Sequence, residues 1–366
     1  WYGYSPKYFA LPAAMIGRRL GDEGVCDKSL ADLVLAGAEV WRRAIESCLT
    51  LNTRDIVIPL SGGLDSRAIL SGVLEHISPH SVHTYTFGIP GTYDYEIGNS
   101  VASIAGTRHC AFDLNRYRYS FDNLLDISCR VDGRTVLFQH APSTLLETEY
   151  NPISVAFWTG FMGDPVAGSH LLKKDSTTWE QAGLHFAERN RFCRSMDLVH
   201  PGFLASRYLP KVPLVDGRVL CYDEQIDYGV RQECYIKPLV LLQGYEYRTP
   251  FLHPEWVGFI LSVPRRYRQG QYLYREILKA AFPKLFSLPT KNNFGLCLAA
   301  PRWRQELCKN KLRLRAAAKR LTPWIDWGIS PSINYIDFDR GLRERPDLKA
   351  VVYESIQDLK KRQIVD

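Results

Sequence analysis

The stretch best suited to chemistry is the hexapeptide Ser61-Gly62-Gly63-Leu64-Asp65-Ser66, whose residue types can bind a phosphate together with a cation. Two adjacent glycines let the backbone come close to an anion, because neither carries a Cβ that would block the approach. The serines add hydroxyl donors. A carboxylate such as Asp65 beside bound phosphates is useful if it holds a cation such as Mg²⁺. The hexapeptide therefore predicts a site where an anion and a metal ion meet.

The segments on either side of the hexapeptide have the patterns needed to position it. Residues 56–60 form an apolar, β-rich run, and residues 67–74 have the spacing of an amphipathic helix. A loop between a strand and a helix gathers unpaired N–H groups at the helix N-terminus, where the helix dipole favours an anion. This is not a Walker loop, which needs four residues between its glycines followed by Gly-Lys-Ser/Thr.

Strand and helix patterns continue to alternate after this helix. Strands are predicted at 82–88, 110–114 and 153–158, and a helix opens near Asp94 and ends at Gly106. Such alternation predicts right-handed βαβ units and a parallel sheet. Because ligands bind outside the carboxyl ends of the strands in such sheets, the loops after residues 60, 87 and 158 should converge at one edge.

Longer helical patterns dominate from about residue 171. We therefore divide the chain into a lead-in over 1–50, a core over 51–170 that contains the hexapeptide, and a mostly helical part over 171–366 that completes the site. A basic segment over 302–320 is interleaved with apolar residues. It has the pattern either of a solvated amphipathic helix or of a contact surface for an anionic partner.

The composition is that of a globular protein. The chain has 366 residues, of which 46% are hydrophobic and 23% charged. No apolar run approaches the roughly 18 residues of a membrane helix. Nine scattered cysteines without Cys-x-x-Cys spacing disfavour a disulfide framework and predict a cytoplasmic location. The net charge of +7 suits phosphate-bearing ligands, but without a local patch it does not indicate nucleic acid.

The hexapeptide resembles the PP-loop of the N-type ATP pyrophosphatases, which cleave ATP between the α and β phosphates. Further motifs in the appropriate order, between about residues 30 and 300, resemble the synthetase domain of asparagine synthetases and of their β-lactam-forming and lasso-peptide-cyclising relatives. These motifs are Phe87-Gly88-Ile89-Pro90-Gly91 with Asp94, Gly160 to Gly168, Arg248-Thr249-Pro250-Phe251-Leu252-His253, and Lys291 with Phe294-Gly295.

The resemblance implies an α/β fold. We expect a parallel, doubly wound sheet of the PP-loop (adenine nucleotide alpha hydrolase-like) type, with a mostly helical C-terminal part. It also implies an ATP-dependent ligase, in which a substrate carboxylate attacks the α-phosphorus of ATP to give an acyl-adenylate and pyrophosphate. Ammonia or an amine then displaces AMP and forms an amide. The first step is catalysed mostly by positioning and by neutralisation of charge.

The same resemblance implies roles for individual residues. Asp65 and Asp164 would hold Mg²⁺ that bridges the phosphates, and Lys291 would stabilise charge in both steps. The residues that would contact ATP are Leu60, Ser61, Gly62, Gly63, Asp65, Ser66, Thr86, Phe87, Gly88 and Gly160.

Three positions depart from the family pattern. Phe161 stands where the family has a glutamate or tyrosine that assists attack by the amine, and a phenyl ring cannot move a proton. Pro165 replaces the second carboxylate of an Asp-Glu pair, and His253 replaces an aspartate. The half of the motif set that binds ATP is thus intact, whereas the half that receives the activated acyl group is altered.

The sequence does not identify the substrates, and it allows two alternative functions. The carboxylate could belong to a small molecule, a sugar or a peptide. Because Cys26 is the first cysteine, no N-terminal glutaminase is visible, although Trp1 leaves open what precedes it. The amine would then be free ammonia, ammonia from a separate glutaminase, or a preformed amine. A tRNA-modifying PP-loop enzyme and a degenerate nucleotide-binding protein are the alternatives, favoured respectively by the basic segment and by Phe161 with Pro165.

Overall fold

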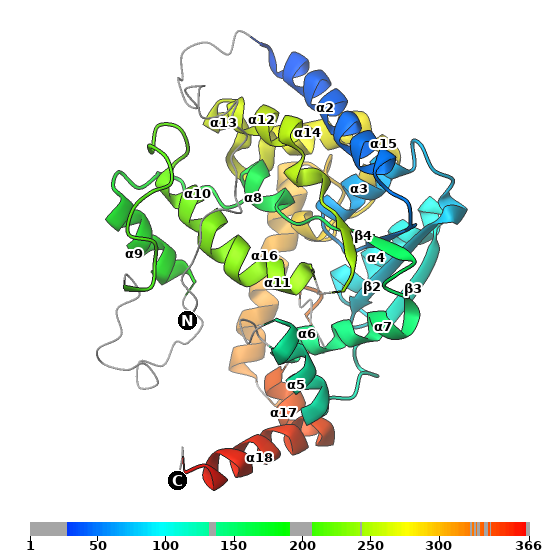
Figure 1. Cartoon of the computed structure of the whole chain (residues 1–366), viewed down its shortest axis with the longest axis vertical. Coiled ribbons are helices and arrows are strands. Elements are labelled where there is room, and N and C mark those ends of the chain that lie inside the picture. The colour runs from blue at the N-terminus through cyan, green and yellow to red at the C-terminus, as the bar shows by residue number, and fades with distance from the viewer. Residues whose placement is uncertain are drawn as a thin grey trace. The chain divides into compact units, whose positions relative to one another are not determined.

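A computed structural model describes residues 28–131, 137–190, 207–241, 244–322, 324–325, 327, 330–332, 336 and 338–363 (Figure 1). The lead-in expected over 1–50 is therefore described from residue 28 onward, and Cys26 lies outside the described residues. Among the helices of the described part, none combines the length and the apolar character that a membrane crossing requires.

A five-stranded sheet of order β3-β2-β1-β4-β5 forms the centre of the fold, and all four strand pairs are parallel. Its strands are β1 (Asp55–Pro59), β2 (Val82–Gly88), β3 (Arg108–Asp113), β4 (Val155–Trp158) and β5 (Glu246–Arg248). The predicted parallel α/β fold is confirmed. The sequence pattern did not predict β5, since three residues are too short a run to show a strand periodicity.

The strand order places the carboxyl ends of β1, β2 and β4 at one edge of the sheet. Consecutive strands run outward from β1 through β2 to β3, whereas β4 returns to the opposite side of β1. The direction of winding thus reverses between β1 and β4. Ligands of open α/β sheets bind in the crevice outside such a reversal, so the loops that follow β1 and β4 flank the expected position of a ligand.

Helices account for most of the remaining described residues. They are α2 (Leu30–Thr50), α3 (Asp65–Val73), α4 (Tyr93–Ala105), α5 (Phe121–Arg130), α6 (Leu137–His140), α7 (Leu145–Glu149), α8 (Gly163–Ala167), α9 (Trp179–Arg189), α10 (Tyr222–Ile226), α11 (Lys237–Val240), α12 (Pro254–Ser262), α13 (Arg265–Arg268), α14 (Tyr272–Ala281), α15 (Pro283–Phe286), α16 (Arg302–Leu321), α17 (Phe338–Glu344) and α18 (Pro346–Lys361). Between α10 and α11 runs a π-helical segment, Asp227–Ile236. Gly106 ends α4 in the left-handed conformation, with φ of 77°, as glycine allows at that position.

The contacts group the chain into two compact units. The sheet unit consists of the described residues of Ile45–Thr159, Leu241–Arg248 and Leu278–Asp366. The helical unit consists of the described residues up to Ala44, of Gly160–Val240 and of Thr249–Ile277. Both units draw on segments that are distant in the sequence, and the domain boundaries at 50 and 170 stay a prediction.

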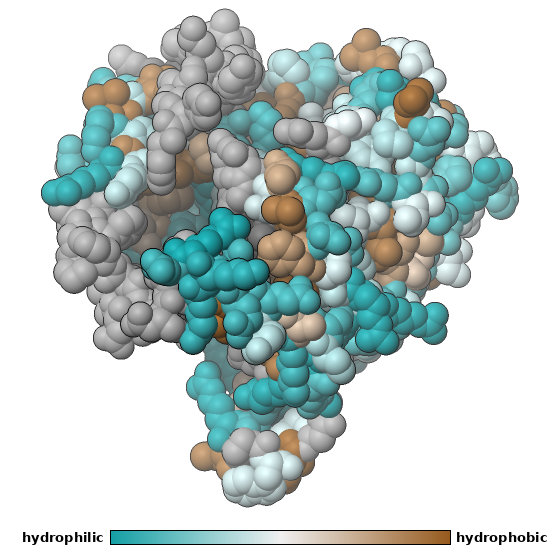
Figure 2. All heavy atoms as spheres, turned by 60° about the horizontal axis from the view of Figure 1, so that its bottom comes forward, coloured by the Kyte–Doolittle hydropathy of each residue, from teal (hydrophilic) through white to brown (hydrophobic). Residues whose placement is uncertain are grey.

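Each unit has its own core. In the sheet unit, β1 pairs with β2 and β4 on its two edges, and its residues Ile56, Val57 and Ile58 are buried. In the helical unit, an aromatic cluster is built around Trp41, which lies 4.4 Å from Phe251 and 5.0 Å from Trp256 between ring centroids. On the face drawn in Figure 2, the coloured hydrophobic residues (brown) form small groups separated by hydrophilic ones (teal).

Candidate functional site

The glycine loop connects the central strand to a buried helix. Helix α3 begins at Asp65, immediately after the loop, and all its residues from Ser66 to Val73 are buried. The residue before the helix, Leu64, has an apolar side chain and makes no capping hydrogen bond. The first N–H groups of a helix lack intrahelical partners, and the dipole adds positive charge there. The loop and the start of α3 therefore have the backbone arrangement that suits an anion, and the anion site expected there stays a prediction.

Lys291 lies at this loop, as the sequence predicted for a residue 230 positions after Ser61. Its backbone N–H donates to the carbonyl of Gly62 at 2.8 Å, and its Nζ lies 2.9 Å from Oδ1 of Asp94. The same Oδ1 accepts a hydrogen bond from the N–H of Gly62 at 2.8 Å. Asp94 therefore joins the lysine to the loop, a connection that the motif alone did not reveal.

The two glycines are required by the closeness of their neighbours. A Cβ on Gly62 would lie 3.0 Å from the carbonyl oxygen of Tyr93 and 3.2 Å from the Cβ of Lys291. A Cβ on Gly63 would lie 3.2 Å from Oγ of Ser61, whose oxygen accepts the N–H of Gly63 at 3.2 Å. A side chain at Gly62 would require the backbone at Tyr93 and the side chain of Lys291 to shift by a few tenths of an ångström, and one at Gly63 would require the same of Ser61, which favours the glycine pair.

A tight turn holds Lys291 in place. Phe294 adopts a left-handed backbone with φ of 56°, and its carbonyl accepts a hydrogen bond from the hydroxyl of Tyr93 at 3.0 Å. Gly295 follows with φ of 80°, and a Cβ there would lie 2.7 Å from the ring of Tyr93. The Phe294-Gly295 part of the motif thus shapes the turn that carries the lysine.

Arg67 connects α3 to the chain just before that turn. Its side chain is fully buried and donates to the carbonyls of Leu285, Leu288 and Pro289, the last at 2.8 Å. Burial lowers the pKa of the Arg67 guanidinium to about 10, which still leaves it charged near neutral pH. Because Pro289 is two residues from Lys291, this cation fixes the approach of the lysine to the loop.

Buried polar atoms without partners lie along the same edge. Oγ of Ser66, Oγ1 of Thr290 and Nε1 of Trp158 have no hydrogen-bond partner among the described residues. Ser66 is in the first turn of α3, Thr290 precedes Lys291, and Trp158 ends β4. Buried polar groups are normally satisfied, so such atoms indicate a ligand or ordered water. Together with the glycine pair and the lysine, these three atoms are compatible with a bound nucleoside triphosphate.

The residues expected to contact the nucleoside lie at the ends of β1 and β2. Oγ1 of Thr86 donates to the carbonyl of Leu60 at 3.1 Å, and the N–H of Leu60 donates to Tyr85. Successive residues of a strand direct their backbone groups to opposite sides. The carbonyl of Gly88 accepts a hydrogen bond from the N–H of Leu114, on the side of β2 that faces β3. The N–H and carbonyl of the preceding residue, Phe87, therefore point to the opposite side, where β1 has already ended. These groups of Phe87 are available to an adenine ring.

The second loop, Gly160 to Gly168, starts two residues after β4. Phe161 is 4% exposed, so this position contributes no polar group to a site. Met162 has a left-handed backbone with φ of 68°, although a residue with a side chain is strained there. Gly168 ends α8 with φ of 96°, and a Cβ there would lie 2.4 Å from the carbonyl oxygen of Arg268.

Asp164 is held by a residue that the sequence motifs did not include. Nε2 of Gln271 donates to its Oδ1 at 2.8 Å, and Gln271 also has a left-handed backbone, with φ of 62°. Asp164 belongs to the helical unit, whereas Asp65, the first residue of α3, belongs to the sheet unit. The Mg²⁺ site shared by these two carboxylates stays a prediction.

A buried ion pair occupies the surroundings of Pro165, where the family has a carboxylate. The guanidinium of Arg268 pairs with the carboxylate of Glu224, and their side chains are 6% and 7% exposed. Arg268 also donates to the carbonyl of Val166 at 3.1 Å. The hydroxyl of Tyr228 lies 2.8 Å from Oε1 of Glu224 and 3.2 Å from the carbonyl of Pro165. The pair and Tyr228 therefore hold the second loop through the carbonyls of Val166 and Pro165.

The helical unit also contains a polar cavity of about 170 Å³. Its wall includes His170, whose Nδ1 lies 2.8 Å from Oδ2 of Asp227, and Arg231, whose NH1 lies 3.4 Å from Nε2 of His170. Asp227 and Arg231 are on the π-helical segment. Such segments are rare and often accompany functional sites. The sequence gave no local signal for this cavity, because its wall combines residues from positions 170 to 231.

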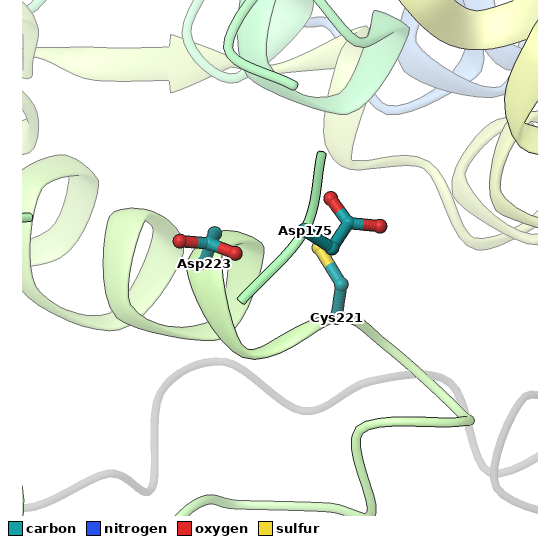
Figure 3. A group of neighbouring side chains, drawn as sticks. All are labelled: Asp175, Cys221 and Asp223. Carbon is teal, nitrogen blue, oxygen red and sulfur yellow. The ribbon is translucent and has the colours of Figure 1, made fainter. Parts of the chain in front are cut away.

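Asp175, Cys221 and Asp223 form a group of potential metal ligands beside this cavity, with ligand atoms within 4.8 Å of one another (Figure 3). Each of these three side chains already has a partner within the protein. Asp175 pairs with Arg265, Asp223 accepts both the N–H and the hydroxyl of Ser176, and Cys221 donates to Glu224. Burial and the neighbouring carboxylates raise the pKa of the Cys221 thiol, which opposes the thiolate that a metal would need. These three groups therefore have protein partners, and we assign no metal to them.

The described residues of the Arg248 to His253 motif make backbone and packing contacts. Arg248 ends β5, pairs with Glu246 and donates to the carbonyl of Leu51. Phe251 is fully buried in the aromatic cluster of the helical unit. Nδ1 of His253, at the position of the family aspartate, is buried and has no hydrogen-bond partner among the described residues.

A parallel sheet of order 3-2-1-4-5, with a glycine loop after its central strand, defines an α/β protein of the adenine nucleotide alpha hydrolase type. The sequence model of the asparagine synthase family matches residues 37–146. These residues, which run from α2 through the glycine loop and β3 to α7, are thus an asparagine synthase domain. The second loop and Lys291 lie beyond the matched segment. A search of curated proteins found no match.

Proposed function

We propose that the protein is an ATP-dependent, amide-forming ligase that adenylates a carboxylate. The observation that carries this proposal is the position of Lys291, whose ammonium group is held by Asp94 against a glycine loop at the N-terminus of a buried helix. The asparagine synthase domain supports the same reaction class, since that family uses ATP to form amides.

In the first step, the N–H groups at the start of α3, the hydroxyl of Ser66 and the ammonium of Lys291 would bind the β- and γ-phosphates. Lys291 is 33% exposed, whereas Asp94 is 7% exposed, so the lysine can turn from the carboxylate toward a phosphate oxygen. These donors stabilise the charge of the departing pyrophosphate when the substrate carboxylate attacks the α-phosphorus. A Mg²⁺ ion held by Asp65 and Asp164 would neutralise further phosphate charge.

In the second step, an amine displaces AMP from the acyl-adenylate and forms the amide. Phe161 cannot accept the proton that this amine loses, because its side chain is apolar and buried. The amine must therefore arrive unprotonated, or lose its first proton to a different group, and the proton released when the amide forms passes to the departing AMP or to water. The substrate carboxylate belongs to a small molecule, a sugar or a peptide, and the nitrogen comes from ammonia or an amine.

Carboxylate-dependent exchange of labelled pyrophosphate into ATP tests the first step. With a panel of amino acids, sugar acids and peptides as carboxylates, we expect exchange with at least one class. Lys291→Ala should reduce exchange about 100-fold, since charge stabilisation of this kind contributes factors of that order. Lys284→Ala is the matched control, because Lys284 is an exposed lysine close in sequence.

A second candidate function, nucleotide binding without amide formation, is favoured by Phe161 and Pro165, which leave the acceptor loop without two of the family's polar groups. In that case ATP would bind and protect the chain from thermal unfolding, but no carboxylate in the panel would support pyrophosphate exchange. Equal, undetectable exchange by wild type and Lys291→Ala would favour this function over the ligase.

A further inference from the structure

Helix α16 carries an unusual concentration of positive charge. Its 20 residues contain eight lysines and arginines and a single acidic residue, Glu306. The excess of seven positive charges equals the net charge of the whole chain, +7. The rest of the chain is therefore balanced, and the electrostatic attraction of the protein for an anionic surface originates in this helix.

The same helix exposes an apolar stripe. None of its residues is buried, and Trp303, Leu307, Leu314 and Leu321 are 60%, 60%, 72% and 76% exposed. They are separated by four, seven and seven residues, so they lie along one face of the helix. Trp324 and Ile325, just after the helix, are also exposed, at 78% and 48%. A helix face that contacts only solvent normally carries polar residues, so four large apolar residues on this face indicate a contact surface.

Cations border the stripe on both sides. With 3.6 residues per turn, Arg304 and Lys311 fall on one flank of the leucines, and Arg313 and Arg320 fall on the other. The guanidinium of Arg304 lies 5.2 Å from the ring of Trp303. Tryptophan and leucine at the centre with lysine and arginine along the borders is the arrangement of helices that lie in the plane of a membrane surface.

We propose that α16 binds the surface of an anionic lipid bilayer, with its axis in the membrane plane. The apolar stripe would enter the boundary between headgroups and acyl chains, and the bordering cations would meet the lipid phosphates. Two other partners of α16 would account for only some of these features. A nucleic acid would attract the cations but would gain nothing from the exposed leucines, and a second copy of the helix would bring like charges together.

Vesicle co-sedimentation of the full chain tests this proposal. We expect binding to vesicles of phosphatidylcholine mixed with phosphatidylserine, weaker binding in high salt, and no binding to phosphatidylcholine alone. Each cation near an anionic surface contributes about fivefold to binding. The triple variant Lys311→Gln, Arg313→Gln, Arg320→Gln should therefore lose binding about 100-fold.

Two further variants separate insertion from simple charge attraction. Leu307→Asn with Leu314→Asn keeps every charge, and it should also release the protein from the mixed vesicles. The control is Lys349→Gln with Lys360→Gln on the exposed face of α18, which should bind about as wild type does. Circular dichroism and pyrophosphate exchange without vesicles confirm that each variant is folded, since no residue of α16 belongs to the proposed catalytic site.

The proposal is overturned if wild type does not bind the mixed vesicles, or if the leucine variant binds them as tightly as wild type. It is equally overturned if tRNA binds wild type and the leucine variant alike and displaces the vesicles, because the helix would then be a nucleic-acid surface. None of these outcomes affects the ligase assay, so the two proposals can fail separately.

Discussion

An ion pair fastens each of the two loops at the ends of β1 and β4, and the pairs differ in exposure. Lys291 and Asp94 hold the glycine loop, with the lysine 33% exposed. Arg268 and Glu224 hold the second loop, with both side chains nearly inaccessible to solvent. A cation that keeps access to solvent can exchange its partner for a substrate phosphate. A cation enclosed with its carboxylate cannot do so.

Electrostatics of the enclosed pair support a structural role. Burial alone would lower the pKa of the Arg268 guanidinium. The charge of Glu224, the hydrogen bond to it and the neighbouring Tyr228 together outweigh burial, so this pKa lies above its ordinary value. Tyr228 donates a further hydrogen bond to Glu224. The pair therefore behaves as a fixed cross-link in the helical unit, whereas we propose that the pair at the glycine loop is part of a binding site.

Removing one partner of the enclosed pair should have the largest effect on stability. Glu224→Gln leaves Arg268 charged and buried without a counter-ion, which costs about 3–5 kcal/mol of unfolding free energy. Urea denaturation followed by tryptophan fluorescence measures this loss. A cost below about 1 kcal/mol would mean that water reaches the pair, contrary to its burial.

The corresponding change at the glycine loop should affect activity rather than stability. Asp94→Asn removes the charge that holds Lys291 and weakens the acceptor of the Gly62 N–H, so the lysine loses its position. We expect pyrophosphate exchange to fall about 100-fold, as for other misplaced catalytic groups. The unfolding free energy should change by about 1 kcal/mol, since the pair is partly exposed. If Asp94→Asn instead unfolds the protein while exchange per folded molecule is unchanged, the two pairs have the same structural role.

A smaller effect is expected at the hydroxyl that has no protein partner. Ser66→Ala removes Oγ, which makes no hydrogen bond among the described residues, so stability should stay within about 0.5 kcal/mol of wild type. The KM for ATP in the exchange assay should rise about tenfold, the value of one hydrogen bond to a charged phosphate. An unchanged KM would place the triphosphate away from α3.

The smallest effect on adenylation is expected at Phe161. Phe161→Tyr adds a hydroxyl at the position where the family assists the amine, and the ring can keep its place. Pyrophosphate exchange should stay within about twofold of wild type, because this residue does not contact the reacting phosphates in our account. A large fall in exchange would show that the second loop takes part in adenylation. Any gain should appear in amide formation with ammonia, measured by chromatography.

Local patterns were sufficient to predict four of the five strands and the glycine loop. The run at 56–60 and the hexapeptide after it became β1 and the start of α3, because a strand, a tight loop and a helix each leave a local signature. The fourth strand, expected over 153–158, begins at Val155. By contrast, β5 has only three residues and depends on pairing with β4, which no local pattern records.

The partners that orient the site could not be predicted, since they join distant positions. Asp94 is part of a sequence motif, but its contacts with Gly62 and Lys291 appear only in the folded chain. Gln271 precedes no recognisable motif, yet it holds Asp164. The Glu224–Arg268 pair likewise joins segments that are unrelated in sequence. Such contacts depend on the geometry of the fold rather than on residue spacing.

Transfer of labelled oxygen tests the central claim, adenylation of a carboxylate, most directly. A carboxylate that supports pyrophosphate exchange is prepared with ¹⁸O in its carboxyl group and incubated with ATP, Mg²⁺ and ammonia, and the nucleotide products are analysed by mass spectrometry. Attack on the α-phosphorus predicts that one ¹⁸O atom appears in AMP for each amide formed. Label in inorganic phosphate, with ADP as the nucleotide product, would contradict the account, because the carboxylate would then have attacked the γ-phosphate.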